Sequence, residues 1–252
     1  MNFVKRLLYR ILSPKNYLKL LHIVFYWMYD LNLLKGKQTF KYHYLVKKVI
    51  QPDFVVVDIG ANLGYFSKNF ARLTPKGQVI SIEPIPLFHD VLSSFLNKYK
   101  HVQTHNVALG MEEGKTIMVL PTDNGMIRTG LPHIAKNDAE LQKHDNQEVA
   151  IVRGSELLKD LPKIDYIKCD IEGFEGIVFK EIEQIIQKFK PFVQLEISSE
   201  NKGEILQLFS RNGYQQYGIA NYQFIKEVGN QKEEGDYFFV PNERESDFLK
   251  WI

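Results

Sequence analysis

Cysteine is nearly absent, since the 252 residues hold only Cys169. A single cysteine excludes an intramolecular disulfide and a multi-cysteine zinc site, and it favours a reducing compartment. Glycine and proline are also sparse, at 16 and 10 residues, which excludes collagen and low-complexity disorder. With 44% hydrophobic and 25% charged residues, the composition is that of a globular chain long enough for one large α/β domain. We therefore expect a globular cytoplasmic protein.

Long apolar runs are also lacking. The segment 20–29 is shorter than the roughly 20 apolar residues that a transmembrane helix needs. Lys15 and Lys19 interrupt the apolar pattern before it, and no small-residue cleavage site follows. We therefore expect neither a membrane-spanning helix nor a secretory signal.

Acidic residues are almost missing from the first fifty positions. Residues 1–50 hold ten Lys or Arg against the single acid Asp30, a net charge of +9, whereas the 22 bases and 29 acids that follow give −7. The same segment holds ten of the 32 aromatic residues. We expect 1–50 to be a basic, aromatic-rich helical extension and 51–252 to be the main domain.

Two interpretations of this extension stay open. In the first, residues 1–30 form an amphipathic surface on an anionic membrane, which would place the protein peripherally at the inner membrane face. In the second, two helices broken at Ser13–Pro14 pack their aromatics on the domain or on a partner subunit. No zinc-finger, helix-turn-helix or aromatic RNA-binding signature accompanies the basic residues, so we expect no nucleic-acid partner.

Beyond residue 50, short β-rich runs alternate with helical patterns. This alternation predicts an α/β fold, with a mostly parallel sheet and helices on both faces. The expected strands are 54–58, 79–83, 102–107, 166–170 and 192–197, with 223–228 and 237–240 closing the far edge. A strand candidate at 116–120 and a polar stretch at about 121–148 interrupt the pattern. Such a long polar stretch is usually functional or disordered, and we expect it to be a substrate lid.

The first expected strand runs into a glycine turn and then a helix. Gly60 and Gly64 remove side chains where backbone must approach a ligand, and Asn62 tolerates a left-handed conformation. Glu83 closes the next strand, 25 residues after Asp58, where a carboxylate can bridge two ribose hydroxyls. An acid before the loop would repel a pyrophosphate but suits a cofactor with an amino group and a sulfonium, which points to S-adenosylmethionine. The structural alternatives are a turn cap for Asp58 and a solvated acid for Glu83.

From residue 54 to about 240, the chain resembles the FkbM-type methyltransferase family of class I S-adenosylmethionine-dependent enzymes. Five blocks carry the likeness: D-I-G-A-N-L-G-Y-F at 58–66, I-E-P at 82–84, N-V-A-L-G at 106–110, I-D-Y-I-K-C-D-I-E-G-F-E at 164–175 and P-F-V-Q-L-E at 191–196. The resemblance implies a Rossmann-like sheet of seven strands, the last antiparallel, with the cofactor across the carboxyl ends of the strands.

The expected cofactor-binding residues follow these blocks: Asp58, Gly60, Asn62, Gly64, Tyr65, Glu83, Asn106 and Val107. By the family likeness, the loop at 60–64 contacts the methionine part and Glu83 contacts the ribose. Asn106 and Val107 would then lie by the adenine. Tyr65 is a candidate to stack against the sulfonium.

Asp170 and Glu172 are the candidate catalytic residues, because the end of the fourth strand would present both carboxylates beside the transferred methyl group. A carboxylate that takes the proton of an acceptor hydroxyl contributes roughly 10² to 10⁴ in rate. Capping of the following helix is the structural alternative for both acids. His133 in the expected lid is another candidate base. Mg²⁺ held by Asp170, Glu172 and Glu196 is a further alternative, which we do not favour.

The sequence therefore predicts an S-adenosylmethionine-dependent O-methyltransferase. Its acceptor would be a hydroxyl of a glycan, a lipid-linked sugar or a secondary metabolite. The alternative is a catalytically silent methyltransferase-like domain that serves as an adaptor at a membrane or partner surface. The intact glycine loop and the retained acids favour the enzyme.

Overall fold

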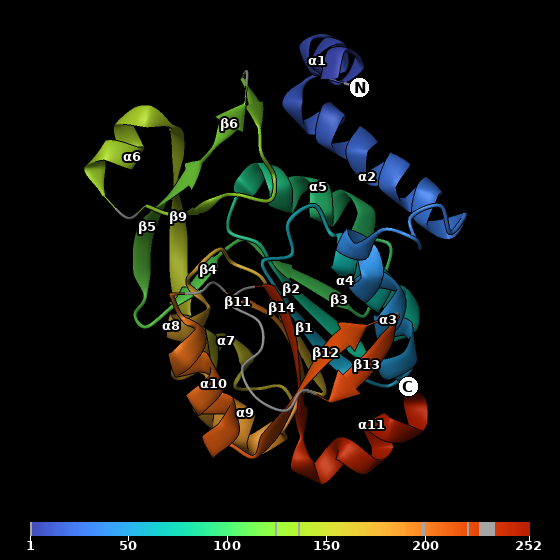
Figure 1. Ribbon diagram of the computed structural model, residues 1–252. Coiled ribbons are helices and arrows are strands. Elements are labelled where there is room, and N and C mark those ends of the chain that lie inside the picture. The colour runs from blue at the N-terminus through green and yellow to red at the C-terminus, as the bar shows by residue number, and fades with distance from the viewer. Residues whose placement is uncertain (1, 124, 136, 198–199, 221, 227–234) are drawn as a thin grey trace.

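The computed structural model describes residues 2–252 except 124, 136, 198–199, 221 and 227–234. An eight-stranded sheet forms its centre, with helices on both faces (Figure 1). From edge to edge the strands are β13 (Gln223–Lys226), β12 (Tyr214–Ala220), β14 (Gly235–Pro241), β11 (Phe192–Ile197), β10 (Tyr166–Cys169), β1 (Val55–Ile59), β2 (Gln78–Ile82) and β3 (Val102–His105). The five strands from β11 to β3 are parallel, which confirms the mostly parallel α/β sheet.

The far edge of this sheet differs from the expectation. In the described part of the chain the sheet has eight strands rather than seven, because β13 adds an edge. The last strand, β14, is antiparallel to β11, as the resemblance implied. However, β14 lies between β11 and β12, so the prediction that 237–240 closes the edge is wrong. Residues 227 and 228 of the other expected edge run lie outside the described residues.

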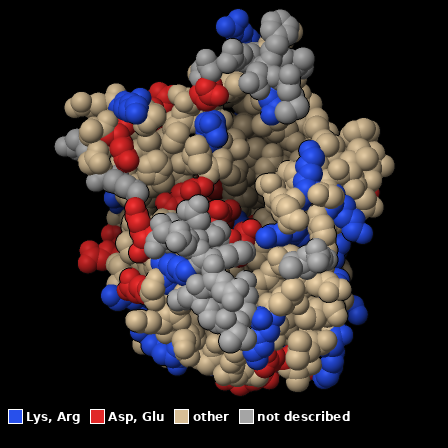
Figure 2. Space-filling view, viewed as in Figure 1, with Lys and Arg blue, Asp and Glu red and all other residues tan. Residues whose placement is uncertain are grey.

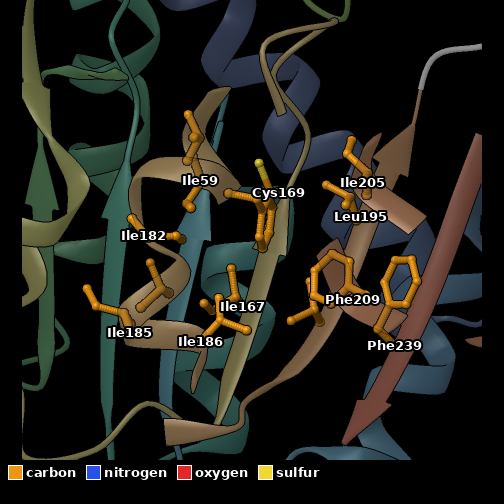
Figure 3. Close-up of a cluster of buried hydrophobic side chains, with 14 of the residues drawn as sticks. Ile59, Ile167, Cys169, Ile182, Ile185, Ile186, Leu195, Ile205, Phe209 and Phe239 are labelled. Atoms are coloured by element: carbon orange, nitrogen blue, oxygen red, sulfur yellow. The ribbon is translucent and has the colours of Figure 1, made fainter. Parts of the chain in front are cut away.

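The central strands are apolar on both sides because helices cover both faces of the sheet. On one face, Val56 packs with α3 (Lys41–Val49), α4 (Tyr65–Leu73) and α11 (Glu245–Trp251). On the other, Val57 and Ile59 join a cluster formed with α8 (Glu175–Glu181), α9 (Glu183–Phe189) and α10 (Lys202–Arg211). Figure 3 shows part of this second cluster, which includes Cys169. Cys169 is therefore a buried core residue.

A second, four-stranded sheet is inserted after β3 and sits at one side of the molecule (Figure 1). Its order is β4 (Ala108–Gly110), β9 (Asp145–Arg153), β5 (Gly114–Leu120) and β8 (His133–Ile134). The same insertion contains β6 (Thr122–Asp123), β7 (Met126–Ile127) and α6 (Asp138–Lys143), while α7 (Gly154–Leu158) follows it. The expected strand at 116–120 is thus confirmed within β5. The polar stretch at 121–148 contains secondary structure that its composition does not indicate.

The N-terminal segment forms α1 (Asn2–Ile11) and α2 (Pro14–Asp30), followed by the short helix η1 (Gln38–Phe40). Ser13 caps α2, since its Oγ accepts a hydrogen bond from the Asn16 N–H at 3.4 Å, and Pro14 occupies the first turn. α2 lies against α4 and α5 (Pro86–Leu96). A short helix, η2 (Asn242–Arg244), precedes α11. Within the described residues, no helix is both long and apolar enough to cross a membrane.

Candidate functional site

A cavity of about 300 Å³ opens at the carboxyl ends of β1, β2, β10 and β11. This volume is at the lower end of the range for ligand pockets. Its walls come from the glycine loop after β1, the ends of the neighbouring strands, α5 and the inserted sheet. Figure 2 shows the hollow and the acidic side chains that gather beside it. Ligands of open α/β sheets bind at this edge of the strands.

The glycine loop follows β1 directly, and its conformation explains its glycines. Gly60 has φ +75°, and a Cβ placed there would lie 2.0 Å from the Asp170 carbonyl oxygen. Gly64 has φ +86°, and its Cβ would lie 2.7 Å from Leu92 Cδ1 on α5. Both glycines therefore permit close packing within the protein. Gly60 also lines the cavity, whereas Gly64 does not.

Asn62 lines the cavity and connects the loop to the insertion. It adopts the left-handed conformation expected for it, with φ +52°. Its Oδ1 accepts a hydrogen bond from the Leu63 N–H at 2.7 Å, and its Nδ2 donates to the Thr129 carbonyl. Thr129 and Gly130 also line the cavity. The expected lid segment thus contributes part of the cavity wall.

Glu83 lies at the end of β2 with 4% of its surface exposed. Its Oε2 accepts a hydrogen bond from the Asn62 N–H at 2.8 Å, and its Oε1 accepts one from the Ile85 N–H at 2.9 Å. Burial raises the pKa of Glu83 to about 7, although these two hydrogen bonds favour the charged form. Glu83 lines the cavity. With this pKa, its carboxyl group gains or loses a proton near neutral pH.

Of the two residues expected by the adenine, the structure brings one to the cavity. Val107 lines the cavity wall. Asn106 instead braces the turn after β2, since its Nδ2 donates hydrogen bonds to the carbonyls of Glu83 at 2.9 Å and Pro84 at 2.8 Å. Asn106 therefore helps to hold Glu83 in position.

Asp58 is fully buried beneath the loop and does not line the cavity. Its Oδ2 accepts a hydrogen bond from Ser67 Oγ, and its Oδ1 lies 3.7 Å from Lys168 Nζ. Lys168 Nζ also donates to the Gly60 carbonyl at 3.1 Å and lies 3.3 Å from Asp170 Oδ2. Burial disfavours the charge on Lys168, but the two carboxylates outweigh it and raise the pKa of the ammonium. Asp58 and Lys168 are buried, and together with the partly exposed Asp170 they fix the loop against β10.

Asp170 and Glu196 both line the cavity, and two carboxyl groups that interact there do not ionise together. Burial and the Asp170 charge raise the pKa of Glu196 to about 8. Burial acts in the same direction on Asp170, but Lys168 and the protonated Glu196 overcome it and lower the pKa of Asp170. Glu196 therefore carries the proton, and Asp170 remains a carboxylate.

The sequence pattern suggested Glu196 only as a metal ligand and did not indicate this pairing. The available signal was an acid at the end of the expected fifth strand, in the block P-F-V-Q-L-E. Because β11 pairs in parallel with β10, the ends of these two strands meet at one edge. Adjacent parallel strands that each end in an acid can bring two carboxyl groups together.

Glu172 lines the cavity and is exposed, with φ +53°. Burial and then the charges of Asp170 and Glu175 raise its pKa. Capping of the following helix was the alternative role for Asp170 and Glu172. It is Glu175, however, whose side chain hydrogen-bonds to the backbone before this helix. Its Oε1 accepts hydrogen bonds from the Ile171 N–H at 3.2 Å and the Gly173 N–H at 3.1 Å.

Besides Asp58, Gly64 and Asn106, two further expected site residues do not line the cavity. His133 is on β8, with its Nδ1 2.9 Å from the Leu131 carbonyl oxygen and its Nε2 3.5 Å from Glu140 Oε2. Its neighbours in sequence, Pro132 and Ile134, are the residues that face the cavity. Tyr65 packs toward α2, with its ring centroid 4.5 Å from that of Phe25. The structure therefore separates both side chains from the cavity wall.

The described residues contain no group of three or more His, Cys, Asp or Glu side chains that could hold a metal ion. Asp170, Glu172 and Glu196 all line the cavity without forming such a group. The magnesium alternative therefore gains no support from the donor set.

Comparison with known proteins gives a match to the family described as Methyltransferase FkbM domain, over residues 58–215. Methyltransferase 1 of Beauveria bassiana is 23% identical over 150 residues, which cover 52% of this chain and 59% of that protein. Methyltransferase sdnD of Sordaria araneosa is 25% identical over 187 residues, covering 59% of this chain and 72% of that protein. The chain thus spans less than two thirds of the first of these relatives.

Among solved structures, the methyltransferase FkbM of Methylobacillus flagellatus aligns with a TM-score of 0.49 and 17% identity. The alignment covers 75% of this chain and 44% of that one.

Proposed function

The chain belongs to the FkbM methyltransferase family, and from that premise we propose that it transfers a methyl group from S-adenosylmethionine to a hydroxyl oxygen. The observation that carries the proposal is the Asp170–Glu196 carboxyl pair, which shares a cavity with the glycine loop and Glu83. Asp170 remains a carboxylate in this pair, and a carboxylate in the cavity can accept the proton of an acceptor hydroxyl.

The residues at the cavity fit a cationic adenosyl donor. Its lining includes four carboxyl groups, and none of the described lining residues is Lys, Arg or His. Each oxygen of Glu83 accepts one backbone hydrogen bond, which leaves further acceptor capacity for ribose hydroxyls. Ile82 and Val107 supply an apolar wall for the adenine base of the donor. When bound, S-adenosylmethionine would supply a methyl group made electrophilic by the attached sulfonium.

The carboxyl pair supplies the proton acceptor in this proposal. Asp170 would accept a hydrogen bond from the acceptor hydroxyl and would take its proton when the methyl group is transferred. Lys168, 3.3 Å from Asp170, fixes the position of the carboxylate. Glu196 retains its proton and thereby limits the charge at the cavity floor. Glu172 is placed to bind a further hydroxyl of the acceptor.

The charge of the cavity also limits the chemical class of the acceptor molecule. Anionic groups would be repelled by the carboxylates that line it. We propose a neutral, hydroxyl-bearing acceptor: a glycan, a lipid-linked sugar or a secondary metabolite. The backbone around Thr129 and Gly130 can offer hydrogen bonds to such a molecule.

Transfer of a radiolabelled methyl group into a cell lysate, fractionated by acceptor class, tests this proposal. We expect label in a neutral hydroxyl-bearing fraction with the wild type. With Asp170→Asn, the turnover rate should fall by roughly 10² to 10⁴ because the base is lost. Asp160→Asn, at an exposed acid, serves as the matched control and should behave as wild type. Label that is insensitive to Asp170→Asn would contradict the role of this carboxylate, and no donor binding at all would favour a silent adaptor.

A further inference from the structure

Helix α2 has two apolar faces, and only one of them packs on the protein. The packed face carries buried residues at helical spacing: Leu18, His22, Phe25, Tyr26 and Tyr29. The opposite stripe is exposed, with Ile23 at 53%, Val24 at 44% and Trp27 at 62% of their surface accessible. Leu31, at the C-cap of the helix, extends it with 54% exposed. A helix that covers a domain is expected to be polar on its outer side, so the second stripe needs a partner.

Helix α1 also exposes apolar side chains. Leu7 and Ile11, one turn apart, are 46% and 70% exposed. Figure 1 shows α1 and α2 at one margin of the molecule, outside the helices that flank the sheet. We define the α1–α2 face as Leu7, Ile11, Ile23, Val24, Trp27 and Leu31.

The charges around the α1–α2 face are almost all positive. Lys5, Arg10, Lys35 and Lys37 are exposed. The single acid of the segment, Asp30, is already paired with Arg72, whose Nη1 lies 2.8 Å from its Oδ1. Exposed Leu, Ile and Trp side chains bordered by Lys and Arg are typical of helices that lie in the interface of an anionic membrane.

We propose that the α1–α2 face docks on the surface of an anionic lipid bilayer. The apolar side chains enter the headgroup boundary, and the lysine and arginine side chains contact the lipid phosphates. The helices lie on the bilayer rather than crossing it, which agrees with the lack of a spanning helix in the described residues.

Docking of this face would also bring the cavity near the lipid. Leu8 of α1, Leu12 of the turn that follows and Leu21 of α2 belong to a cluster that includes Phe88 and Ile134, which line the cavity. A lipid-linked sugar could then reach the carboxyl pair without leaving the membrane. This consequence rests on the proposed function, whereas the docking itself does not.

Vesicle flotation of the full chain tests the docking. We expect binding to vesicles that contain phosphatidylglycerol, and little binding to vesicles of phosphatidylcholine alone. Since each basic residue near an anionic surface contributes a few-fold in binding, Arg10→Gln should weaken the partition about fivefold. Leu31→Glu should abolish it, while Leu249→Glu on α11, at an equally exposed leucine, should not.

Tryptophan fluorescence gives a second readout of the same proposal. The protein has two tryptophans, and Trp251 packs against Phe54 and Phe192. In a Trp251→Phe background, the emission of Trp27 should shift to the blue on addition of anionic vesicles. Emission and flotation unchanged by lipid charge would overturn the proposal. So would a dimer that Leu31→Glu dissociates without any vesicle binding, because a second copy would then cover the face. Methyl transfer to a soluble acceptor by Leu31→Glu reports separately on the proposed function.

Discussion

The carboxyl group of Glu196, whose ionisation is opposed by burial and by the Asp170 charge, makes the cavity sensitive to pH. The pKa of Glu196 is raised from 4.5 to about 8, so between these values the unfolded chain has released a proton that the folded chain retains. The contribution of Glu196 to stability therefore falls as pH rises through this window. Glu196→Gln keeps a hydrogen-bond donor beside Asp170 but cannot ionise.

We accordingly expect Glu196→Gln to gain stability relative to wild type as the pH increases from 5 to 8. Chemical unfolding at a series of pH values measures this difference. Glu113→Gln, at an exposed acid, is the control and should show no such trend. A difference that stays constant with pH would mean that Glu196 does not hold the proton.

Within the glycine loop, Gly60 is the residue least able to accept a side chain. A Cβ at this position would meet the Asp170 carbonyl at 2.0 Å, and its φ of +75° disfavours other residues. Gly60→Ala should therefore destabilise the protein by about 1–3 kcal/mol or more. Thermal unfolding measures the loss. Gly36→Ala, where nothing lies within 4 Å of the added Cβ, should stay within about 0.5 kcal/mol of wild type.

At the scale of elements, α2 braces the glycine loop as well as offering an outer face. His22 is fully buried, and its Nδ1 lies 2.8 Å from the Leu63 carbonyl oxygen, so this nitrogen must carry the proton. Tyr26 donates a hydrogen bond from its hydroxyl to the Tyr65 carbonyl at 2.7 Å. Burial and the Lys68 charge lower the pKa of His22 to about 3. As pH falls from 6.5 toward 3, His22 binds a proton in the unfolded chain but not in the folded chain. The free energy of unfolding therefore decreases over this range.

His22→Phe should preserve the stacking on Phe95 but leave the Leu63 carbonyl without its partner. At pH 7 we expect a loss of about 1–3 kcal/mol in the free energy of unfolding. At pH 4 the difference from wild type should narrow, because the variant no longer has a histidine to protonate at this site. Urea unfolding at both pH values checks the prediction, and a difference that widens at pH 4 would refute it.

Strands that are buried along their whole length are the easiest to predict from the sequence pattern. All five residues of β1 are buried, so its run of apolar residues is plain in the sequence. In β9, by contrast, only Val149 is buried, and the strand resembles a polar loop. β6, β7 and β8 have two residues each, which is too short for any periodicity. Local pattern therefore located most of the central sheet, although not β12, and only β5 of the inserted sheet.

The site was predicted in outline for the same reason. Strand ends and glycine turns are local signals, and they located Gly60, Asn62, Glu83 and Asp170 at the cavity. The direction of a side chain depends on what packs beside it. Tyr65 turns toward α2 because Phe25 and His22 lie there, and no local pattern contains that contact. The Asp170–Glu196 pair likewise depends on two strands separated by α8 and α9.

At the scale of the whole molecule, an acidic cavity and a basic N-terminal segment lie on one chain. We propose a cationic donor for the cavity at the carboxyl edge of the sheet and an anionic surface for the N-terminal helices. The central claim concerns the first of these. If ribose hydroxyls donate hydrogen bonds to Glu83, they stabilise its ionised form, and its pKa of about 7 falls on binding.

Calorimetric titration of S-adenosylmethionine at pH 6.5, in buffers of different ionisation enthalpy, tests this claim most directly. We predict that the wild type binds and releases a proton to the buffer. Glu83→Gln should bind roughly tenfold or more weakly without proton release, and Glu113→Gln should match wild type. Equal affinity and equal proton exchange in wild type and Glu83→Gln would contradict the assignment of this cavity to the methyl donor.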